Sequence, residues 1–430
     1  MKFSILKKPK IEYDFFLSMP RGMRVLLITN IIYAFVLPVI DLFVGAYIMR
    51  TSDEPRLVAI YQLSVYTGIP VTFLINGFLL NKIKIAHLYS FGMLLSGISM
   101  VFMMTLGEVN APGVAFSGLI MGSSFGFFWA NRDFLALNTT NDNNRNYYYG
   151  LETFFYTLTT ILVPVTIGWF LISSGRWKWI GNIANAYKIV TFVVFLLTIF
   201  SSYIIHKEKF RNPTRKRFVF FRFDKLWSRM LFLSSLKGLA QGYLVTAPAI
   251  LIMRLVGDEG SLGNIQSMSG VLSAIILYIL GRISKPKHRI YIFSAGLVVF
   301  FIGTLVNGVL FSATGVIVFV ICKVMFQPLH DIAYFPIQMK VIDVLSYKEK
   351  RNQFAYIFNH EFGLYIGRFL GLGLFIFLIT YVSESFALKY SLIIIAAIQL
   401  LSIPVARRVV RRANRYESDP ETSPAEIQDN

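Results

Sequence analysis

The chain has 430 residues, of which 55% are hydrophobic and only 15% are charged, and its mean hydropathy is +0.59. Soluble globular chains carry about a quarter charged residues, so this composition excludes an ordinary soluble enzyme. The net charge of +19 could suggest nucleic-acid binding, but the basic residues lie in loops between apolar runs, where they indicate membrane topology instead.

Apolar runs of about twenty residues recur from Val25 to Val405, and each can cross a hydrocarbon core of about 30 Å at about 1.5 Å per residue. The run 290–310 is apolar on every face, which disfavours the alternating pattern of a membrane β-barrel. The sequence therefore predicts an all-α membrane protein with twelve transmembrane helices. The predicted spans are 23–48, 57–81, 86–106, 113–138, 147–173, 184–205, 229–254, 261–281, 289–311, 313–338, 354–381 and 386–406.

Most of the 42 Lys and Arg residues fall on the side that both termini share, so we predict that both termini are cytoplasmic. The longest polar connection, 206–228, is strongly basic and separates two six-helix halves. Its Phe residues and Trp227 fit a helix on the inner leaflet, and a solvated basic linker fits about equally well. The predicted organisation is a cytoplasmic segment 1–22, a first half 23–205, a linker 206–228, a second half 229–406 and a cytoplasmic disordered tail 407–430.

A weak internal repeat supports the division into halves. Arg50 and Arg254 each close the sequence IMR, at the ends of the first and seventh spans. Glu152 in the fifth span corresponds in the same way to Glu361 in the eleventh. Repeated halves with a site between them are a common plan of secondary transporters.

The span number, the inside termini and the basic central loop resemble the major facilitator superfamily (MFS). The segment GFLLNKIKI keeps Gly77, Lys82 and Lys84 of the family's loop motif, but it has Asn81 for the aspartate and Ile83 for the second glycine. The resemblance implies a monomer that works by alternating access. It also implies that spans one, four, seven and ten, backed by two, five, eight and eleven, line a central cavity.

Charged and imidazole side chains inside the spans are costly, so they usually face a cavity or a partner and mark function. Away from span ends they occur only in the spans that the resemblance assigns to the cavity. They are the candidate substrate-binding or coupling residues: Asp41, Arg132, Asp133, Glu152, Lys237, Lys323, His330, Asp331, His360, Glu361 and Arg368.

Glu361 and Glu152 are the favoured proton-coupling sites. A partly desolvated carboxyl group can exchange a proton near neutral pH and thereby change the charge that holds the two halves together. A structural gate, in which these charges only lock the inner helix ends, is an equally good interpretation. Arg132 and Asp133 point about 100° apart on a helix, so we expect their partners on other helices.

Asp41 lies in the outer part of span one, and Pro38 just before it can loosen the helix by removing a hydrogen bond. A cation or proton site is one interpretation of Asp41. An ordinary ion pair with Lys237 or Arg254 is the other.

The neighbours His330 and Asp331, like His360 and Glu361, could suggest a metal site, but their spacing does not demand one. Proton relays and hydrogen-bonded structural histidines both remain open for them. We predict no metal and no cofactor. A membrane enzyme with His360 and Glu361 as acid and base is disfavoured because no nucleophile motif accompanies them.

The leading hypothesis is a secondary active transporter in the cell (inner) membrane, coupled to protons or another ion, with membrane lipids and no nucleic acid as further partners. Its solute would be a small charged, zwitterionic or amphipathic compound. The alternative is a lipid flippase, or an exporter of amphipathic compounds, on the same fold.

Overall fold

The computed structural model describes residues 16–140, 142–177, 181–210, 212, 220, 222–283, 286–351 and 353–417. These residues are almost all helical and include no strand. Among them, twelve helical segments are long and apolar enough to cross a membrane. The predicted all-α fold with twelve spans is therefore confirmed.

The first half holds six spans, and the first of them is broken into three pieces. Its helices are α2 (Arg21–Ala34), the π-helical turn η2 (Val39–Phe43), α3 (Val44–Ser52), α4 (Pro55–Leu79), α5 (Ile85–Thr105), α6 (Ala111–Thr139), α7 (Asp142–Trp177) and α8 (Ile183–His206).

The second half repeats this plan, and its first span is again broken. Its helices are α9 (Lys225–Leu244), α10 (Ala247–Leu255), α11 (Glu259–Ile283), the short η3 (Pro286–His288), α12 (Arg289–Leu310), α13 (Ala313–Glu349), α14 (Gln353–Tyr381), α15 (Glu384–Gln399) and α16 (Ser402–Glu417).

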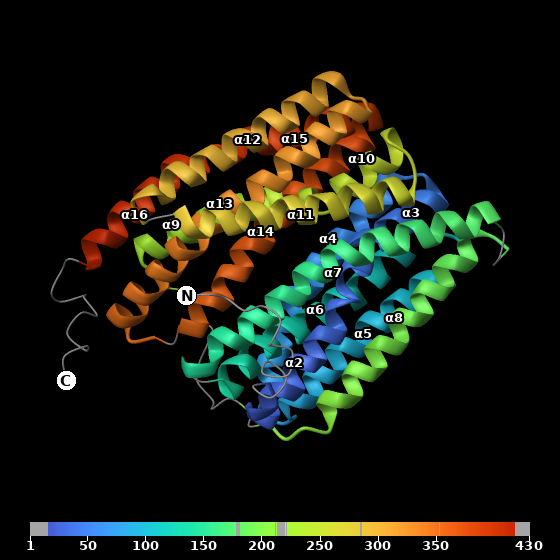
Figure 1. Ribbon diagram of the computed structural model, residues 1–430. Coiled ribbons are helices and arrows are strands. Elements are labelled where there is room, and N and C mark those ends of the chain that lie inside the picture. Colours follow the sequence, from blue (N-terminus) through green and yellow to red (C-terminus); the bar gives the residue numbers. More distant parts are fainter. Residues whose placement is uncertain are drawn as a thin grey trace, which may run out of the picture.

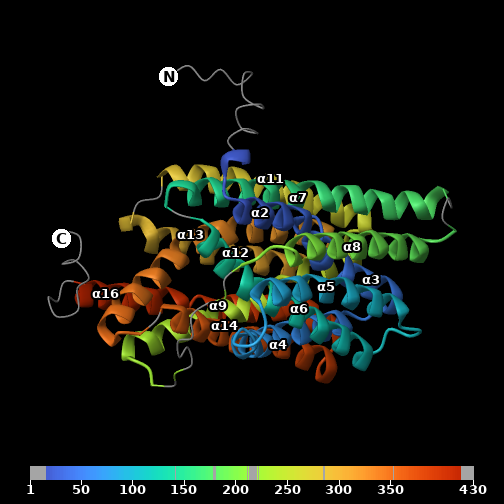
Figure 2. The same cartoon turned by 90° about the horizontal axis from the view of Figure 1, so that it is seen from below.

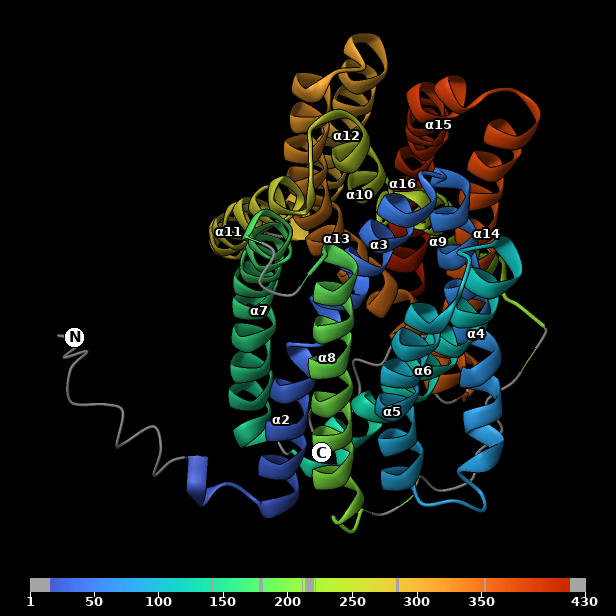
Figure 3. The same ribbon diagram turned by 90° about the vertical axis from the view of Figure 1, so that its right-hand side faces the viewer.

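The two halves form separate bundles that meet chiefly along α7 with α11, α4 with α14, and α3 with α10. In Figure 1 the first half is blue to green and the second half is yellow to red, and they approach each other near α3 and α10. Helix α7 packs against α11 and α4 against α14. The pair α7 and α11 lies side by side in Figures 2 and 3. We call the end where α2 begins and α16 ends the terminal end, and the opposite end the far end.

The break in the first span follows the predicted effect of Pro38. Helix α2 stops at Ala34, and the backbone N–H groups of Val39 and Ile40 both donate to the carbonyl oxygen of Val36 at 3.2 Å. Proline has no N–H to continue the helical ladder, and the turn after it winds as a π-helix that contains Asp41. Short π-helical segments occur frequently at functional sites.

Small residues let the helices of each half approach closely. On α6, a Cβ atom added at Gly122 would lie 2.1 Å from the carbonyl oxygen of Val65 on α4. On α14, a Cβ atom added at Gly367 would lie 1.9 Å from the carbonyl oxygen of Ser235 on α9. Such contacts between backbones drive helix association in membranes, where hydrophobic burial cannot.

Gly122→Ala is expected to destabilise the first half by about 1–3 kcal/mol, because the added methyl group must push α4 away from α6. The midpoint of thermal unfolding in detergent measures this loss. Gly373→Ala is the matched control, since a Cβ atom at Gly373 meets nothing within 4 Å. Equal midpoints for the two variants would contradict the close packing of α4 and α6.

Helices α13 and α16 continue well past the predicted span ends. Helix α13 continues to Glu349, past the predicted span end at 338. Helix α16 continues to Glu417, so residues 407–417 are helical and not the start of a disordered tail. The rest of the predicted tail, 418–430, lies outside the described residues. The extension of α13 includes Lys340, Asp343, Lys348 and Glu349, and that of α16 includes five arginines, so hydropathy did not include them in the spans.

The described parts of the predicted linker contact both halves. Asn212 donates to the carbonyl oxygens of Leu80 and Ile83 at 2.8 Å, and it accepts from the backbone N–H of Ile85. The side-chain amide of Asn212 thus holds the loop between α4 and α5, which contains Asn81. Trp227 belongs to α9 and is fully buried, so the predicted place for its ring at the lipid interface is wrong.

Candidate functional site

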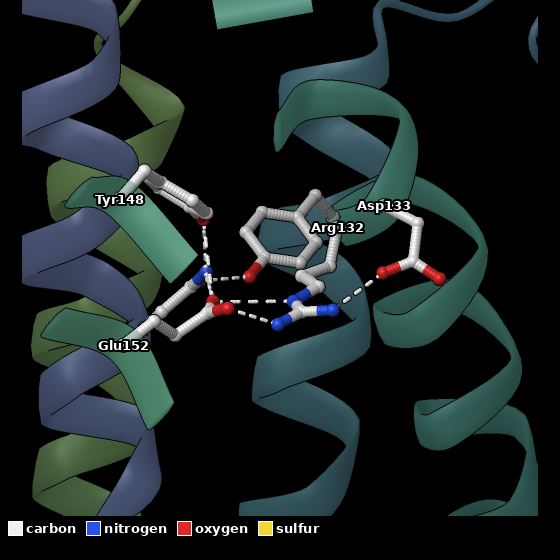
Figure 4. A network of polar contacts seen from close by, with 6 residues as sticks. Arg132, Asp133, Tyr148 and Glu152 are labelled. Atoms are coloured by element: carbon white, nitrogen blue, oxygen red, sulfur yellow. Dashed lines mark hydrogen bonds and ion pairs between the residues drawn. The ribbon is translucent and has the colours of Figure 1, made fainter. Parts of the chain in front are cut away.

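One charged cluster of the first half joins α6 to α7 (Figure 4). The guanidinium of Arg132 lies between two carboxylates: it donates to Asp133 at 2.6 Å and forms a bidentate pair with Glu152. Glu152 also accepts from Asn30 at 2.6 Å and from Tyr148 at 3.2 Å. Every bond of this cluster stays within the first half.

The two carboxylates of this cluster differ in exposure. The Glu152 side chain is 2% exposed, whereas the Asp133 side chain is 67% exposed. The expectation that Arg132 and Asp133 do not pair is wrong, because the five donors of a guanidinium can serve a neighbour and another helix together. The expected partner on another helix is present as well, in Glu152.

A second cluster joins α9, α13 and α14 in the second half. The ammonium of Lys237 pairs with Asp331 at 2.8 Å, and Nδ1 of His330 lies 3.1 Å from the same carboxylate. Tyr334 lies beneath Lys237, with its ring centre 4.3 Å from the ammonium nitrogen. The Tyr334 hydroxyl is 2.7 Å from Nε2 of His360. Both histidines therefore serve as hydrogen-bonding groups.

Arg368 connects the second half to the first. It pairs with Glu361 at 3.6 Å and donates to the amide oxygen of Gln241 at 2.9 Å. Its guanidinium also lies over the ring of Tyr66 on α4, 4.7 Å from the ring centre. Arg368 thus links Glu361 to a residue of the first half.

Most of the predicted charges do not bridge the halves. Among the described residues, Arg132, Asp133 and Glu152 pair within the first half, and Lys237 with Asp331 pairs within the second. Neither cluster therefore joins the two halves by an ion pair, and the structural gate and the coupling role both stay predictions. Each half folds around its own charged cluster.

The ion pairs that do bridge the halves lie at the far end, where α3 and α10 meet. Arg50 on α3 forms a bidentate pair with the fully buried Glu259 on α11, which also accepts from Tyr187 at 3.0 Å. Arg254 on α10 pairs with Asp53 at 2.6 Å. We call these five residues the far-end clamp.

Sequence reasoning did not assign a function to the clamp. Its residues stand at span ends, where charges are ordinary. The only signal was the repeated IMR, which matches Arg50 with Arg254. The structure explains this match, because each arginine ends the first span of its own half and pairs with a carboxylate of the other half.

A cavity of about 340 Å³ lies between the halves. Asp41 on η2 and Lys323 on α13 line it, and they are the charged residues in its lining. Within the part of the chain that the structure describes, neither side chain forms a hydrogen bond or an ion pair. The remaining lining is Pro38, Leu42, Thr157, Thr160, Pro164, Val245, Gln266, Ser269, Gly270, Ser273, Ala274, Leu277, Val324 and Gln327.

The predicted ion-pair partners of Asp41 are wrong. Lys237 pairs with Asp331, and Arg254 pairs with Asp53 and Glu384. Asp41 instead shares the cavity with Lys323, from the opposite half. The clamp lies beyond them toward the far end, since Arg50 follows Asp41 along the first span.

A search of the described residues finds no group of three or more His, Cys, Asp or Glu side chains that could hold a metal ion. Asp41 and Lys323 are suited to bind charged groups of a solute. The arrangement offers ionic recognition of a solute.

Twelve spans in two halves, with a charged cavity between them and ion pairs across one end, define a multi-pass membrane transporter. The family model of the Major Facilitator Superfamily matches residues 25–372, so the chain belongs to this family of secondary transporters. Such transporters bind small-molecule solutes.

A curated relative and two solved structures are similar to most of the chain. The Bacillus subtilis (strain 168) uncharacterized protein YqgE is 22% identical over 386 residues, which cover 87% of this chain and 86% of that protein. The POT family transporter PepTSo superposes with a TM-score of 0.70 at 8% identity, over 94% of this chain and 99% of that chain. A bacterial homologue of the human drug peptide transporters PepT1 and PepT2 gives 0.66 at 11% identity, over 92% and 98%. At these identities the structures show the fold.

Proposed function

We propose that this protein is a proton-coupled secondary transporter that carries a small charged solute across the cell (inner) membrane by alternating access. The observation that carries the proposal is the cavity, where Asp41 and Lys323 come from opposite halves and face the same space without partners. Unpaired charges at membrane depth are costly, and they commonly mark a substrate or ion pathway. The transporter acts as a monomer, without metal or cofactor.

We place both termini in the cytoplasm. Five arginines gather in α16 at the terminal end: Arg407, Arg408, Arg411, Arg412 and Arg415. Basic residues near span ends are retained on the cytoplasmic side and are attracted to anionic lipids there. In this orientation the clamp closes the outer face, and the solute leaves or enters the cavity from the inner face.

Alternating access then requires the clamp to break while the inner ends of the halves close. The solute site lies between the halves, so a rocking motion exposes it to one side at a time. Glu361 is the coupling carboxylate that fits this motion, because its charge holds Arg368 and Arg368 rests on Tyr66 of the other half. Glu152 fits less well, since several hydrogen bonds fix it within one half.

Glu361→Gln is expected to abolish accumulation of solute against its gradient while leaving exchange of solute intact. A neutral amide mimics the protonated carboxyl group, so the proton cycle stops although the cavity is unchanged. Uptake into proteoliposomes under a pH gradient, beside counterflow without one, measures the two activities. Glu108→Gln, at an exposed loop carboxylate, is the control. Unchanged proton-driven uptake in Glu361→Gln would remove Glu361 from the coupling role.

A thermal-shift screen of the purified protein tests the solute class. A ligand at about 100 times its dissociation constant stabilises the folded protein by about 2.7 kcal/mol. Stabilisation by soluble charged metabolites supports the proposal. Stabilisation by amphiphiles or lipid headgroups alone would overturn it in favour of a flippase.

A further inference from the structure

Resting on the proposed function, we propose that the solute is a zwitterion that spans the cavity, with its cationic group on Asp41 and its anionic group on Lys323. The solute therefore belongs to the class of small amino acids, short peptides and related compounds that carry both charges. The proposal assigns one end of the solute to each half of the protein.

The charges that line the cavity favour a zwitterionic solute. Asp41 and Lys323 are the charged groups in the lining, and their signs are opposite. A solute with one charge would contact one of them and leave the other at membrane depth without an ion pair to the solute, which is unfavourable. A zwitterion satisfies both and adds no net charge. It is therefore the ionic class that leaves no charge unpaired.

The neutral lining supports the same class. Gln266 and Gln327 can donate and accept hydrogen bonds beside the charges, as can the hydroxyl groups of Ser269 and Ser273. Leu42, Val245, Leu277 and Val324 provide apolar surface for a short hydrocarbon body. The volume of about 340 Å³ lies near the lower limit for small-molecule sites, which favours a solute of the size of an amino acid or a dipeptide.

Asp41 and Lys323 belong to opposite halves, so a zwitterion that binds both would connect the halves. Asp41 is held on the π-helical turn of the first half, and Lys323 is held on α13 of the second. A zwitterion that contacts both ties the halves together across the cavity. A ligand shifts a conformational equilibrium only when it binds the two states differently, and a contact with both halves provides that difference.

Matched compounds test the proposal on the full-length protein in detergent. The probes are the ω-amino acids from glycine to 6-aminohexanoate, α-amino acids and dipeptides. Each ω-amino acid is compared with the alkylamine and the alkylcarboxylate of the same length, by thermal shift and then by calorimetry. We expect at least one zwitterion to bind about 10–100-fold more tightly than either of its singly charged counterparts.

Two variants test which charged group of the solute binds Asp41 and which binds Lys323. Asp41→Asn should lose the preference for a compound with an amine, so that the alkylcarboxylate binds as well as the zwitterion. Lys323→Gln should lose the preference for a carboxylate instead. Glu108→Gln and Lys188→Gln, at exposed positions outside the cavity, are the controls and should keep the wild-type preference.

Three binding results would overturn the zwitterion proposal. The proposal is overturned if every zwitterion that binds is matched in affinity by one of its singly charged counterparts. It is also overturned if both variants lose the same preference. The proposal is overturned as well if none of the tested zwitterions stabilises the protein. The proposed function fails separately, when a compound binds in the cavity but proteoliposomes do not transport it. If a compound with a single charge is transported, the zwitterion proposal is contradicted but the proposed transporter function stands.

Discussion

Glu259→Ala is expected to open the far end of the protein. The substitution removes the carboxylate that Arg50 and Tyr187 both contact, and Glu259 is fully buried, so Arg50 loses its partner across the halves. Breaking a fully buried ion pair by removing one partner costs about 3–5 kcal/mol. The Arg50 side chain is 38% exposed, so the loss here is smaller, about 1–3 kcal/mol. A difference of about 1.4 kcal/mol changes a two-state equilibrium tenfold, so this loss shifts the protein toward the outward-open state.

Side-specific thiol labelling measures this change. A cysteine replaces Ser269 in the cavity, in a Cys322→Ser background, because Cys322 is the chain's single native cysteine. A reagent that cannot cross the membrane should label this cysteine from the outer side severalfold faster in Glu259→Ala. Glu54→Ala is the control, since the Glu54 carboxylate pairs with Arg56 of the same half. The charge swap of Arg50 and Glu259 should restore slow labelling. Equal outer labelling with and without Glu259 would show that the clamp does not hold the far end closed.

Glu152→Ala is expected to lower the free energy of unfolding by about 3–5 kcal/mol, because the side chain is buried and Arg132 would lose its bidentate partner. Asn30 and Tyr148 would lose an acceptor as well. Asp133→Ala in the same cluster should cost less than about 1 kcal/mol, because the Asp133 side chain is 67% exposed. Thermal unfolding of both variants in detergent gives the comparison.

The reverse order of stability for these two variants, or a similar small loss in both, would contradict a structural role for Glu152. It would return Glu152 to the group of candidate coupling residues. A stable Glu152→Ala variant with defective proton-driven transport would be the clearest sign of that role.

The spans were predictable because hydrophobic length is a local property. The predicted run 184–205 corresponds to α8, and 289–311 corresponds to α12. The broken first span was predictable at Pro38, since proline removes a backbone donor. The break before α10 was not predicted, although Pro248 follows it at the start of that helix.

Side-chain partners could not be predicted, because they depend on which faces of distant helices meet. Asp41 and Lys237 are both charged residues in cavity-lining spans, and the sequence cannot show that Lys237 is already paired with Asp331. Arg132 reaches two carboxylates through its length and its several donors, which an angular rule for neighbours does not capture.

Residues at span ends were the most difficult to interpret. Arg50, Asp53 and Glu259 look like ordinary loop charges in the sequence, and only their contacts across the halves mark them as a clamp. The cavity could be predicted in outline through the family resemblance. Its pair of unpartnered charges became evident only when Asp41 and Lys323 were seen to face the same space.

Uptake from a mixture of small metabolites into proteoliposomes tests the central claim most directly. A pH gradient is imposed, and mass spectrometry identifies the compounds that accumulate inside. We expect at least one zwitterion to accumulate above its outside concentration with the wild-type protein. A protonophore should abolish this accumulation, and so should Asp41→Asn. If nothing accumulates, or if uptake persists in both Asp41→Asn and Lys323→Gln, the cavity is not the solute site of a proton-coupled transporter.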